Sequence, residues 1–316
     1  MTTALTKPTG GSDEPIPAGD VVLDVRNVTL RFGGLTSLND VSLQMRRGSV
    51  LAVIGPNGAG KTSLFNCLTG AYTPQEGSVE FTPGPGGKGA GKTVGLLGRR
   101  PHKIARLGVA RTFQNIRLFP ALTVLENVQV GVETRQKSDA VSSMLRLPNA
   151  RRDQRNSVAE AYRLLELVGL TSKSNELAAA LPYGEQRRLE IARALGTVPS
   201  LLLLDEPAAG TNPTEKVELS ALIRRIADTG VSVLLIEHDM PLVMGLANEV
   251  VVLNFGKVIA TGRPDQVQRD PAVIEAYLGA ESEETAVDAT DLPDATAPGT
   301  GAVAAPRHDD TTGDAR

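Results

Sequence analysis

Three short apolar runs predict buried strands. They are SVLAVI (49–54), the leucines that open LLLLDEP (201–207), and the apolar part of VSVLLIEH (231–238). Leucine and β-branched residues dominate all three, which is typical of strands buried on both faces of a parallel sheet. Each run leads into glycines, carboxylates or a histidine. Open α/β sheets place ligands at the carboxyl ends of their strands, so we predict an α/β fold with one site at that edge.

Other segments repeat apolar residues at helical spacing. Residues 157–170 (SVAEAYRLLELVGL) and 185–195 are predicted to be amphipathic helices. In the second helix, the apolar face carries Leu189, Ala192 and Leu195, and the polar face carries Arg187, Arg188 and Glu190.

These patterns divide the folded region, 21–279, into three parts. We expect an antiparallel β portion from 21–54 and 77–82, a mostly helical arm from about 115–195, and a return to the core strands over 196–279, closing with a hairpin around NFGK (254–257) and a short helix.

Both ends of the chain have the composition of disordered segments. Residues 1–20 are rich in proline and glycine and lack the apolar block of a signal peptide. Residues 280–316 carry nine acidic residues, two arginines and no aromatic residue, too little apolar surface to offset ordering. The single cysteine, Cys67, excludes an intramolecular disulfide and suits a reducing compartment. No apolar run has the length of a membrane span.

Two glycine-rich stretches match the phosphate-loop pattern G-x-x-x-x-G-K-[ST]. They are GPNGAGKTS (55–63) and GGKGAGKTV (86–94). Such a loop needs a buried strand that leads into it and a helix that follows it. The backbone N–H groups of the loop and the positive end of the helix then bind the phosphates jointly. The first stretch follows the run 49–54 and leads into TSLFNCLTG, with apolar residues at helical spacing and Gly70 at the expected helix end.

The second stretch lacks both flanking elements. TPGP precedes it, and VGLLGRRP follows with glycines and a proline that oppose a helix. We therefore predict one nucleotide site per chain and interpret 82–98 as a flexible glycine-rich insertion between two strands.

The first loop assigns roles to its residues. Lys61 should reach the β- and γ-phosphates and Thr62 should hold Mg²⁺ through its hydroxyl. The phosphate-binding set is Gly55, Pro56, Asn57, Gly58, Ala59, Gly60, Lys61, Thr62 and Ser63.

Polar residues after the other two runs complete the predicted site. Asp205 is the expected Mg²⁺-side carboxylate and Glu206 the general base for the attacking water. His238 follows the third run, and we favour a γ-phosphate contact over a structural role.

The start of the helix over 185–195 has two readings. Pro182 presets a first helical turn, and Gly184 lacks a Cβ that could block an approaching anion. The same residues also suit an ordinary helix start.

At this point the motifs resemble a known family. GPNGAGKTS, RTFQNIRLF (111–119), YGEQRRLEIARAL, LLLLDEPAAG and IEHD stand in the order and spacing of an ABC-transporter ATPase subunit. The closing PAVIEAYLGA and the longer forms of these motifs resemble the ATPases of branched-chain amino-acid importers. The resemblance covers about 20–280 and implies a P-loop core, an antiparallel β subdomain and a helical subdomain.

The resemblance also implies residue roles. Phe32 matches the aromatic residue that stacks on adenine, and Gln114 the glutamine that contacts Mg²⁺ and the attacking water. Tyr183, Gly184 and Glu185 match the signature that closes on ATP bound by the opposite subunit. The working form is then an ATPase dimer.

Two positions depart from the usual family pattern. Pro182 replaces the common serine of the signature, and Asn212 stands where most relatives carry aspartate. Both put the usual hydrogen bonds between subunits in doubt.

The resemblance implies a set of partners. These are transmembrane permease subunits, a second ATPase subunit (a related chain being favoured over a second copy), and, indirectly, an extracytoplasmic solute-binding protein. ATP and Mg²⁺ are the expected cofactors, and the cytoplasmic face of the membrane is the expected location. Branched-chain amino acids lead as solute, with other amino acids, urea or short amides as alternatives.

A soluble ABC ATPase of translation or DNA repair is the rival interpretation. The basic segment 99–111 could suggest nucleic acid, but it lacks interleaved aromatics, and a solvated helix face is the favoured reading. No nucleic acid is expected as a partner.

Overall fold

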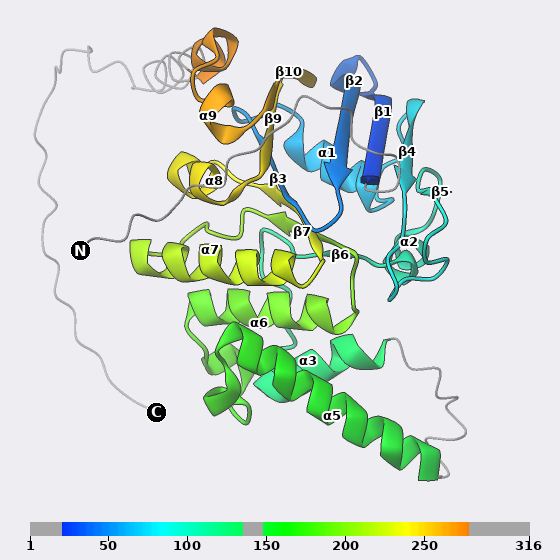
Figure 1. Ribbon diagram of the computed structural model, residues 1–316, viewed down its shortest axis with the longest axis vertical. Coiled ribbons are helices and arrows are strands. Elements are labelled where there is room, and N and C mark those ends of the chain that lie inside the picture. Colours follow the sequence, from blue (N-terminus) through cyan, green and yellow to red (C-terminus); the bar gives the residue numbers. More distant parts are fainter. Residues whose placement is uncertain (1–20, 135–147, 278–316) are drawn as a thin grey trace, which may run out of the picture. The chain divides into compact units, whose positions relative to one another are not determined.

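The computed structural model describes residues 21–134 and 148–277 (Figure 1), with the side chains of 148–153 left aside. The predicted disordered segments, 1–20 and 280–316, lie outside the described residues. So do 278–279, the last two residues of the predicted folded region.

A six-stranded sheet in the order β10-β9-β3-β8-β7-β6 forms the core. Its strands are β3 (Val50–Ile54), β6 (Val109–Arg111), β7 (Leu201–Asp205), β8 (Ser232–Ile236), β9 (Glu249–Asn254) and β10 (Lys257–Gly262). All neighbouring strands pair in parallel except the hairpin β9–β10, which turns at Phe255 and Gly256. The α/β fold and its parallel core are as predicted.

Alternate residues of the core strands face different clusters. Leu201 and Leu203 of β7 pack into the cluster that contains α1 and the second sheet, whereas Leu202 and Leu204 pack against the helical arm. This period of two, with both faces covered by apolar residues, explains why the runs read as continuously hydrophobic.

A second, antiparallel sheet has the order β2-β1-β4-β5. It contains β1 (Val21–Phe32), β2 (Leu35–Arg46), β4 (Glu76–Phe81) and the short β5 (Val94–Gly95). Residues 50–54 belong to the parallel sheet instead, so the range 21–54 predicted for the antiparallel portion was too long. Helix α1 (Lys61–Leu68) shares one hydrophobic cluster with both sheets.

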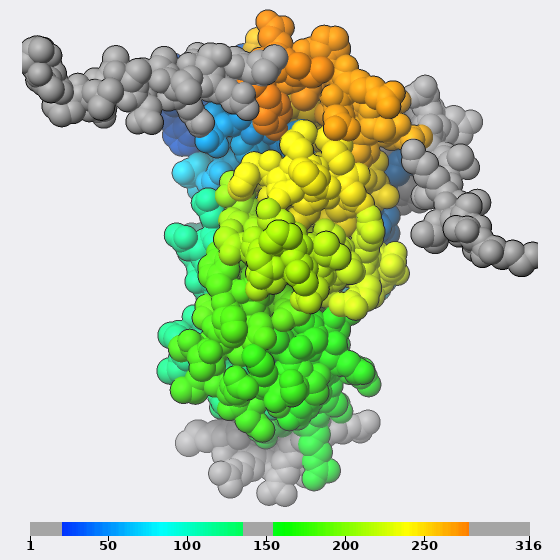
Figure 2. Space-filling model, turned by 90° about the vertical axis from the view of Figure 1, so that its left-hand side faces the viewer, coloured from blue at the N-terminus to red at the C-terminus, as the bar shows by residue number. Residues whose placement is uncertain are grey.

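Helices α3 (Val124–Glu133), α5 (Pro148–Val168) and α6 (Tyr183–Gly196) fall within the range predicted for the helical arm. Short 3₁₀ turns at Thr171–Lys173 and Ala178–Ala180 connect α5 to α6. The arm packs beneath α7 (Pro213–Asp228), which lies between α6 and the core sheet in Figure 1. Helices α8 (Met240–Leu246) and α9 (Pro264–Val267) and a helical stretch at 271–277 follow. Figure 2 shows the arm (green) at one end of the molecule's face and α9 with the stretch 271–277 (orange) at the other, with α7 and α8 between them.

The basic segment 99–111 contains two elements. Helix α2 (Pro101–Leu107) buries Ile104 and Leu107 and exposes its basic residues, as the solvated-face reading predicted. The helix ends at Gly108, however, and the rest of the segment is the edge strand β6.

The glycine-rich segment 82–98 is held against the edge of the core sheet. The amide of Gly84 donates to Ser200 Oγ at 2.7 Å, and that of Lys88 donates to the Arg106 carbonyl at 3.0 Å. A Cβ placed on Gly87 would stand 2.1 Å from the Leu107 carbonyl oxygen. The glycines therefore allow this turn to approach its neighbours closely, and the expectation of a flexible insertion missed these contacts.

Candidate functional site

The first phosphate-loop stretch lies between a buried strand and a helix, as predicted. It leaves β3 at Gly55 and enters α1 after Gly60, which has a φ of 102°. A Cβ at Gly55 would come within 2.0 Å of the Leu253 carbonyl oxygen, and one at Gly60 within 2.6 Å of the Ser37 carbonyl oxygen. Glycine is required at both positions because neighbouring backbone leaves no room for a side chain.

Lys61 is folded over the loop that precedes it. Its Nζ donates to the carbonyl oxygens of Gly55 (2.7 Å) and Pro56 (2.9 Å), and the residue is 9 % exposed. Burial lowers the pKa of Lys61, while the charges of Glu206 and Asp205 act in the opposite direction. The ammonium group thus lies where a phosphate cradled by the loop would meet it.

The next two residues differ in their surroundings. Thr62 is exposed at the first turn of α1, with its hydroxyl available to a ligand. The Ser63 hydroxyl lies 2.7 Å from that of Ser37 on β2, so it ties the helix to the antiparallel sheet.

Asp205, at the end of β7, is 5 % exposed and paired with Arg111. Arg111 Nη2 donates to Asp205 Oδ2 at 2.8 Å and its Nη1 donates to Asn66 Oδ1 at 2.7 Å. The guanidinium also stacks between Phe65 and Phe113, 5.5 and 5.2 Å from the ring centres. Sequence reasoning placed Arg111 in a basic segment and at the start of the motif 111–119 but gave it no role, because nothing local marks it as the partner of Asp205.

The structure brings Gln114 and Glu206 together. Gln114 Nε2 donates to Glu206 Oε2 at 2.9 Å. Glu206 has a φ of 45°, unusual for a residue with a side chain, and its amide donates to the Ile236 carbonyl at 3.0 Å. Strained backbone of this kind concentrates at functional sites. The two residues selected as base and water-positioning group therefore face each other.

His238 lies just beyond β8, between the strand ends that carry the phosphate loop and Asp205. Its imidazole is 64 % exposed, with Nδ1 4.0 Å from Glu237 Oε2. Glu237, which sequence reasoning passed over, is fully buried; its Oε1 accepts from the Ala208 amide at 2.8 Å. Burial raises the pKa of Glu237. The apolar run that precedes it gave no sign that this acid would be the buried one.

Phe32 ends β1 with 45 % of its surface exposed. Its ring meets that of Tyr72 edge-to-face, with centres 5.1 Å apart. Tyr72 was not predicted, and it sets the orientation of the ring that the resemblance assigns to adenine.

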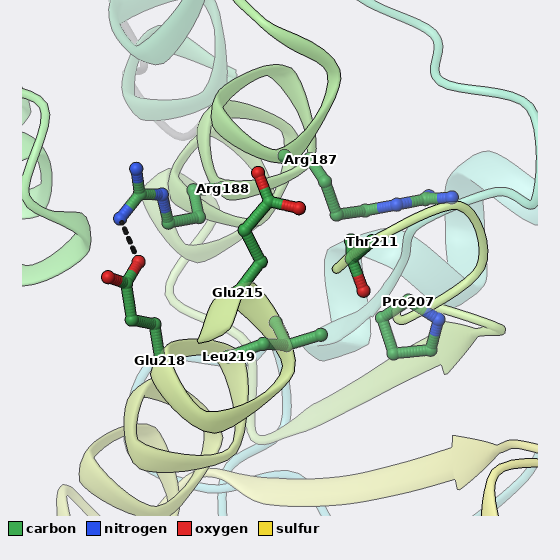
Figure 3. Close-up of a pocket in the computed structure, with 8 residues that line it drawn as sticks. Arg187, Arg188, Pro207, Thr211, Glu215, Glu218 and Leu219 are labelled. Atoms are coloured by element: carbon green, nitrogen blue, oxygen red, sulfur yellow. Dashed lines mark hydrogen bonds and ion pairs between the residues drawn. The ribbon is translucent and has the colours of Figure 1, made fainter. Parts of the chain in front are cut away.

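Tyr183, Gly184 and Glu185 form the first turn of α6, next to α7. A Cβ on Gly184 would lie 2.7 Å from Glu215 Oε1, and Glu185 Oε2 accepts from Lys173 Nζ at 2.6 Å. Figure 3 shows the small pocket at this junction, with Glu215 rising between Arg187 and Arg188. Its lining residues are Gly184, Arg187, Arg188, Pro207, Thr211, Glu215, Glu218 and Leu219.

Both positions that depart from the family pattern cap helices. Pro182 is the N-cap of α6, one residue before the first turn in which it was expected. Asn212 is the N-cap of α7: its Oδ1 accepts from the Glu215 amide, and Glu215 Oε2 accepts from the Asn212 amide, both at 2.9 Å. Asparagine and aspartate cap helices about equally well, so this role tolerates either.

The predicted polar face of α6 was wrong for two residues. Arg187 and Glu190 are both 1 % exposed, and they form an ion pair of 3.0 Å inside the arm. Arg188 remains partly exposed and pairs with Glu218 at 3.2 Å. Helical periodicity separates faces, but it does not reveal that a polar face is covered by a loop.

The donor set of this edge fits ATP with Mg²⁺. The loop supplies backbone N–H groups, a helix N-terminus and Lys61 for phosphates. The Thr62 hydroxyl and the Asp205 carboxylate are hard oxygen ligands, and with its nitrogen bonded to Glu206, Gln114 can offer its amide oxygen. Within the described ranges, no three His, Cys, Asp or Glu side chains lie together as a possible metal site.

Comparison with known proteins identifies the family. The ABC transporter family matches residues 38–209, and a second family, described as branched-chain amino acid ATP-binding cassette transporter, matches 257–283. The chain belongs to the ABC transporter family, as an ATP-binding cassette. It is 46 % identical to the high-affinity branched-chain amino acid transport ATP-binding protein BraF of Pseudomonas aeruginosa, over 82 % of this chain and 98 % of BraF. It is 44 % identical to LivG of Escherichia coli, with the same two coverages.

Solved ATP-binding cassettes share its fold. A nucleotide-free cassette from an ABC transporter superposes with a TM-score of 0.68 at 30 % identity, covering 81 % of this chain and 98 % of that one. The ADP conformation of such a cassette gives 0.69 at 30 % identity, over 82 % and 99 %. Across 21–134 and 148–277, this ATP-binding cassette has no helix both long and apolar enough to cross a membrane.

Proposed function

We propose that this chain hydrolyses ATP to drive the uptake of branched-chain amino acids through partner permease subunits. The observation that supports it best is the Gln114–Glu206 contact beside Asp205 and the phosphate loop. That arrangement suits activation of a water molecule next to a bound phosphate. The solute follows from the names of the relatives and from the second family match, because nothing in this site would contact an amino acid.

The residues divide the work by position. Lys61 and the loop amides bind the phosphates, and Phe32 stacks on the base. Glu206 accepts the proton of the attacking water, which Gln114 orients. Thr62, Asp205 and Gln114 would hold Mg²⁺, whose charge would offset that of the phosphates. His238 is proposed as a γ-phosphate contact, since its exposed ring stands at the same sheet edge.

We further propose that two ATPase chains complete each site. The first turn of α6 contacts Glu215 and Lys173 within its own chain and leaves Tyr183 44 % exposed. A helix start with an exposed first residue can receive the phosphate held by an opposite subunit. A related second ATPase is favoured over a second copy. The complex is expected at the cytoplasmic face of the membrane, with a solute-binding protein on the other side.

Glu206→Gln tests the chemistry. The variant keeps the size of the side chain but cannot accept a proton, so hydrolysis should fall by roughly 10²–10⁴-fold while ATP binding persists. Hydrolysis is measured as phosphate release by the assembled transporter, and ATP binding is measured by equilibrium titration. Glu133→Gln, an exposed change at the end of α3, is the control. Near-wild-type turnover in Glu206→Gln would remove Glu206 from the mechanism.

Uptake of radiolabelled solutes tests the transport function. Cells with and without this chain are compared for leucine, isoleucine and valine, and for other amino acids, urea and short amides. Loss of branched-chain uptake alone supports the proposal. Loss of another solute would reassign the substrate, and recovery of the chain with ribosomes or DNA, with no uptake defect, would favour the soluble rival.

A further inference from the structure

Helix α6 contains a buried ion pair for which the phosphate site has no use. Arg187 and Glu190 stand one turn apart, with side chains 1 % and 2 % exposed and their charged atoms 3.0 Å apart. Burial raises the pKa of Glu190, against the opposing effects of backbone amides and of Arg187. Taking two charges out of water is expensive and often adds no net stability. We therefore expect the pair to do something other than stabilise the fold.

Arg187 holds the backbone of the segment that carries Gln114. Its Nη1 donates to the Phe113 carbonyl at 2.5 Å and its Nη2 to the Gln114 carbonyl at 2.8 Å. Nη2 also donates to the Tyr183 hydroxyl at 3.2 Å. In Figure 3 the side chain of Arg187 points away from that of Arg188, its neighbour in sequence. The two arginines serve different surfaces: Arg188 pairs with Glu218 on α7.

Glu190 grips the same segment farther on. Its Oε1 accepts from the Arg117 amide at 3.2 Å, while Oε2 holds Arg187. At its other end the segment is tied to the sheet, where the Thr112 amide donates to the Leu203 carbonyl at 2.9 Å. Residues 113–117 thus join the core sheet to the arm, and α6 grips their backbone at three residues.

We propose that Arg187, held in place by Glu190, is a positioning residue that fastens the Gln114 segment to the first turn of α6. The same guanidinium also bonds to the Tyr183 hydroxyl. When Gln114 moves relative to Glu206, the start of α6 therefore moves with Gln114. The planar fork of arginine matches two adjacent carbonyls and a carboxylate, which a lysine ammonium cannot span. This inference rests on the proposed ATPase function.

The first test separates positioning from stability. Arg187→Met with Glu190→Leu removes both members of the pair, so neither stays buried without the other. Arg193, which loses the nearby charge of Glu190, is only partly buried, and the melting temperature should lie within a few degrees of wild type. The carbonyls of 113 and 114 nevertheless lose their donor. We expect turnover of the assembled transporter to fall about tenfold, with ATP affinity within about twofold. Arg163→Met with Glu160→Leu, an exposed pair at the same spacing on α5, is the control and should change neither.

The second test does not depend on catalysis. Hydrogen exchange of amides 113–117 in the isolated full-length chain should speed up in the double variant and not in the control, with exchange in β7 unchanged. Arg187→Lys should give an intermediate result, and it supplies the test if the double variant does not fold. Unchanged exchange at 113–117, or wild-type turnover in a variant of normal melting temperature, would overturn the proposal. A wild-type protein that lacks ATPase activity would instead refute the proposed function and leave the exchange result standing.

Discussion

Residues 55–63 and 86–94 match one sequence pattern and adopt different structures. The first stretch leaves the buried strand β3 and opens α1, with Lys61 9 % exposed over its own loop. The second follows β4 of the antiparallel sheet and leads into β5, where Val94 pairs with Phe81. Its Lys92 is exposed, and no helix begins there.

The difference lies in the elements that flank each stretch. Glycines give both stretches the freedom to turn, but only the first delivers its amides to a helix N-terminus at the carboxyl edge of the core sheet. In the second, Gly87 lets the turn approach Leu107, while Gly84, just before the stretch, approaches Ser200. A phosphate-loop pattern therefore indicates a nucleotide site only together with its strand and helix.

Replacing each lysine by alanine in turn should reveal the largest difference between the two stretches. Lys61→Ala removes an ammonium placed over the loop, and a charge-assisted contact of this kind is worth about 1.5–3 kcal/mol, or about 10–150-fold in ATP affinity. Lys92→Ala should leave the affinity within about twofold. Titration of each variant with a fluorescent ATP analogue provides the measurement, and equal losses would mean that the second stretch is also a phosphate site.

Gly87→Ala should show that the second stretch is structural. The added methyl group would stand 2.1 Å from the Leu107 carbonyl oxygen, so the turn must shift. Overpacking of this kind costs about 1–3 kcal/mol, which lowers the melting temperature by about 2–10 °C in a domain of this size. ATP affinity should not change.

Gly95→Ala is the matched control for this change. A Cβ there meets no atom within 4 Å, and the φ of Gly95 is not in the left-handed region. Equal melting temperatures for Gly87→Ala and Gly95→Ala would contradict the close packing of the second stretch.

A smaller effect should appear in the pH dependence of ATP binding. Burial lowers the pKa of Lys61, so the free protein loses this charge at a lower pH than an exposed lysine would. A bound phosphate favours the charged form, and affinity should therefore fall as pH rises from 8 toward the ordinary pKa of lysine. Lys61→Arg stays charged throughout and should give a flat profile. The same slope in that variant would assign the titration to another group.

Much of the site was predictable because its signals are local. The run 49–54, the glycines of 55–60 and the helical spacing after Lys61 specify strand, loop and helix within a few turns of chain. Asp205 and His238 follow apolar runs at the positions where parallel strands end. The motif order linked Gln114 to Glu206 across 92 residues, which no periodicity could do.

The tertiary structure alone decided which charged groups are buried and whom they bind. Arg111 and Asp205 are 94 residues apart, and Arg187 reaches the Phe113 carbonyl across 74. Periodicity gives the face on which a side chain lies. The sequence thus determined the strands, the phosphate loop and the positions of Asp205 and Glu206 at the end of β7. It could not show that Arg187 and Glu190 lie beneath a loop or that residues 86–94 pack as a turn. The free-energy cost of burying a charge, and the space left beside a glycine, depend on neighbours that only folding brings together.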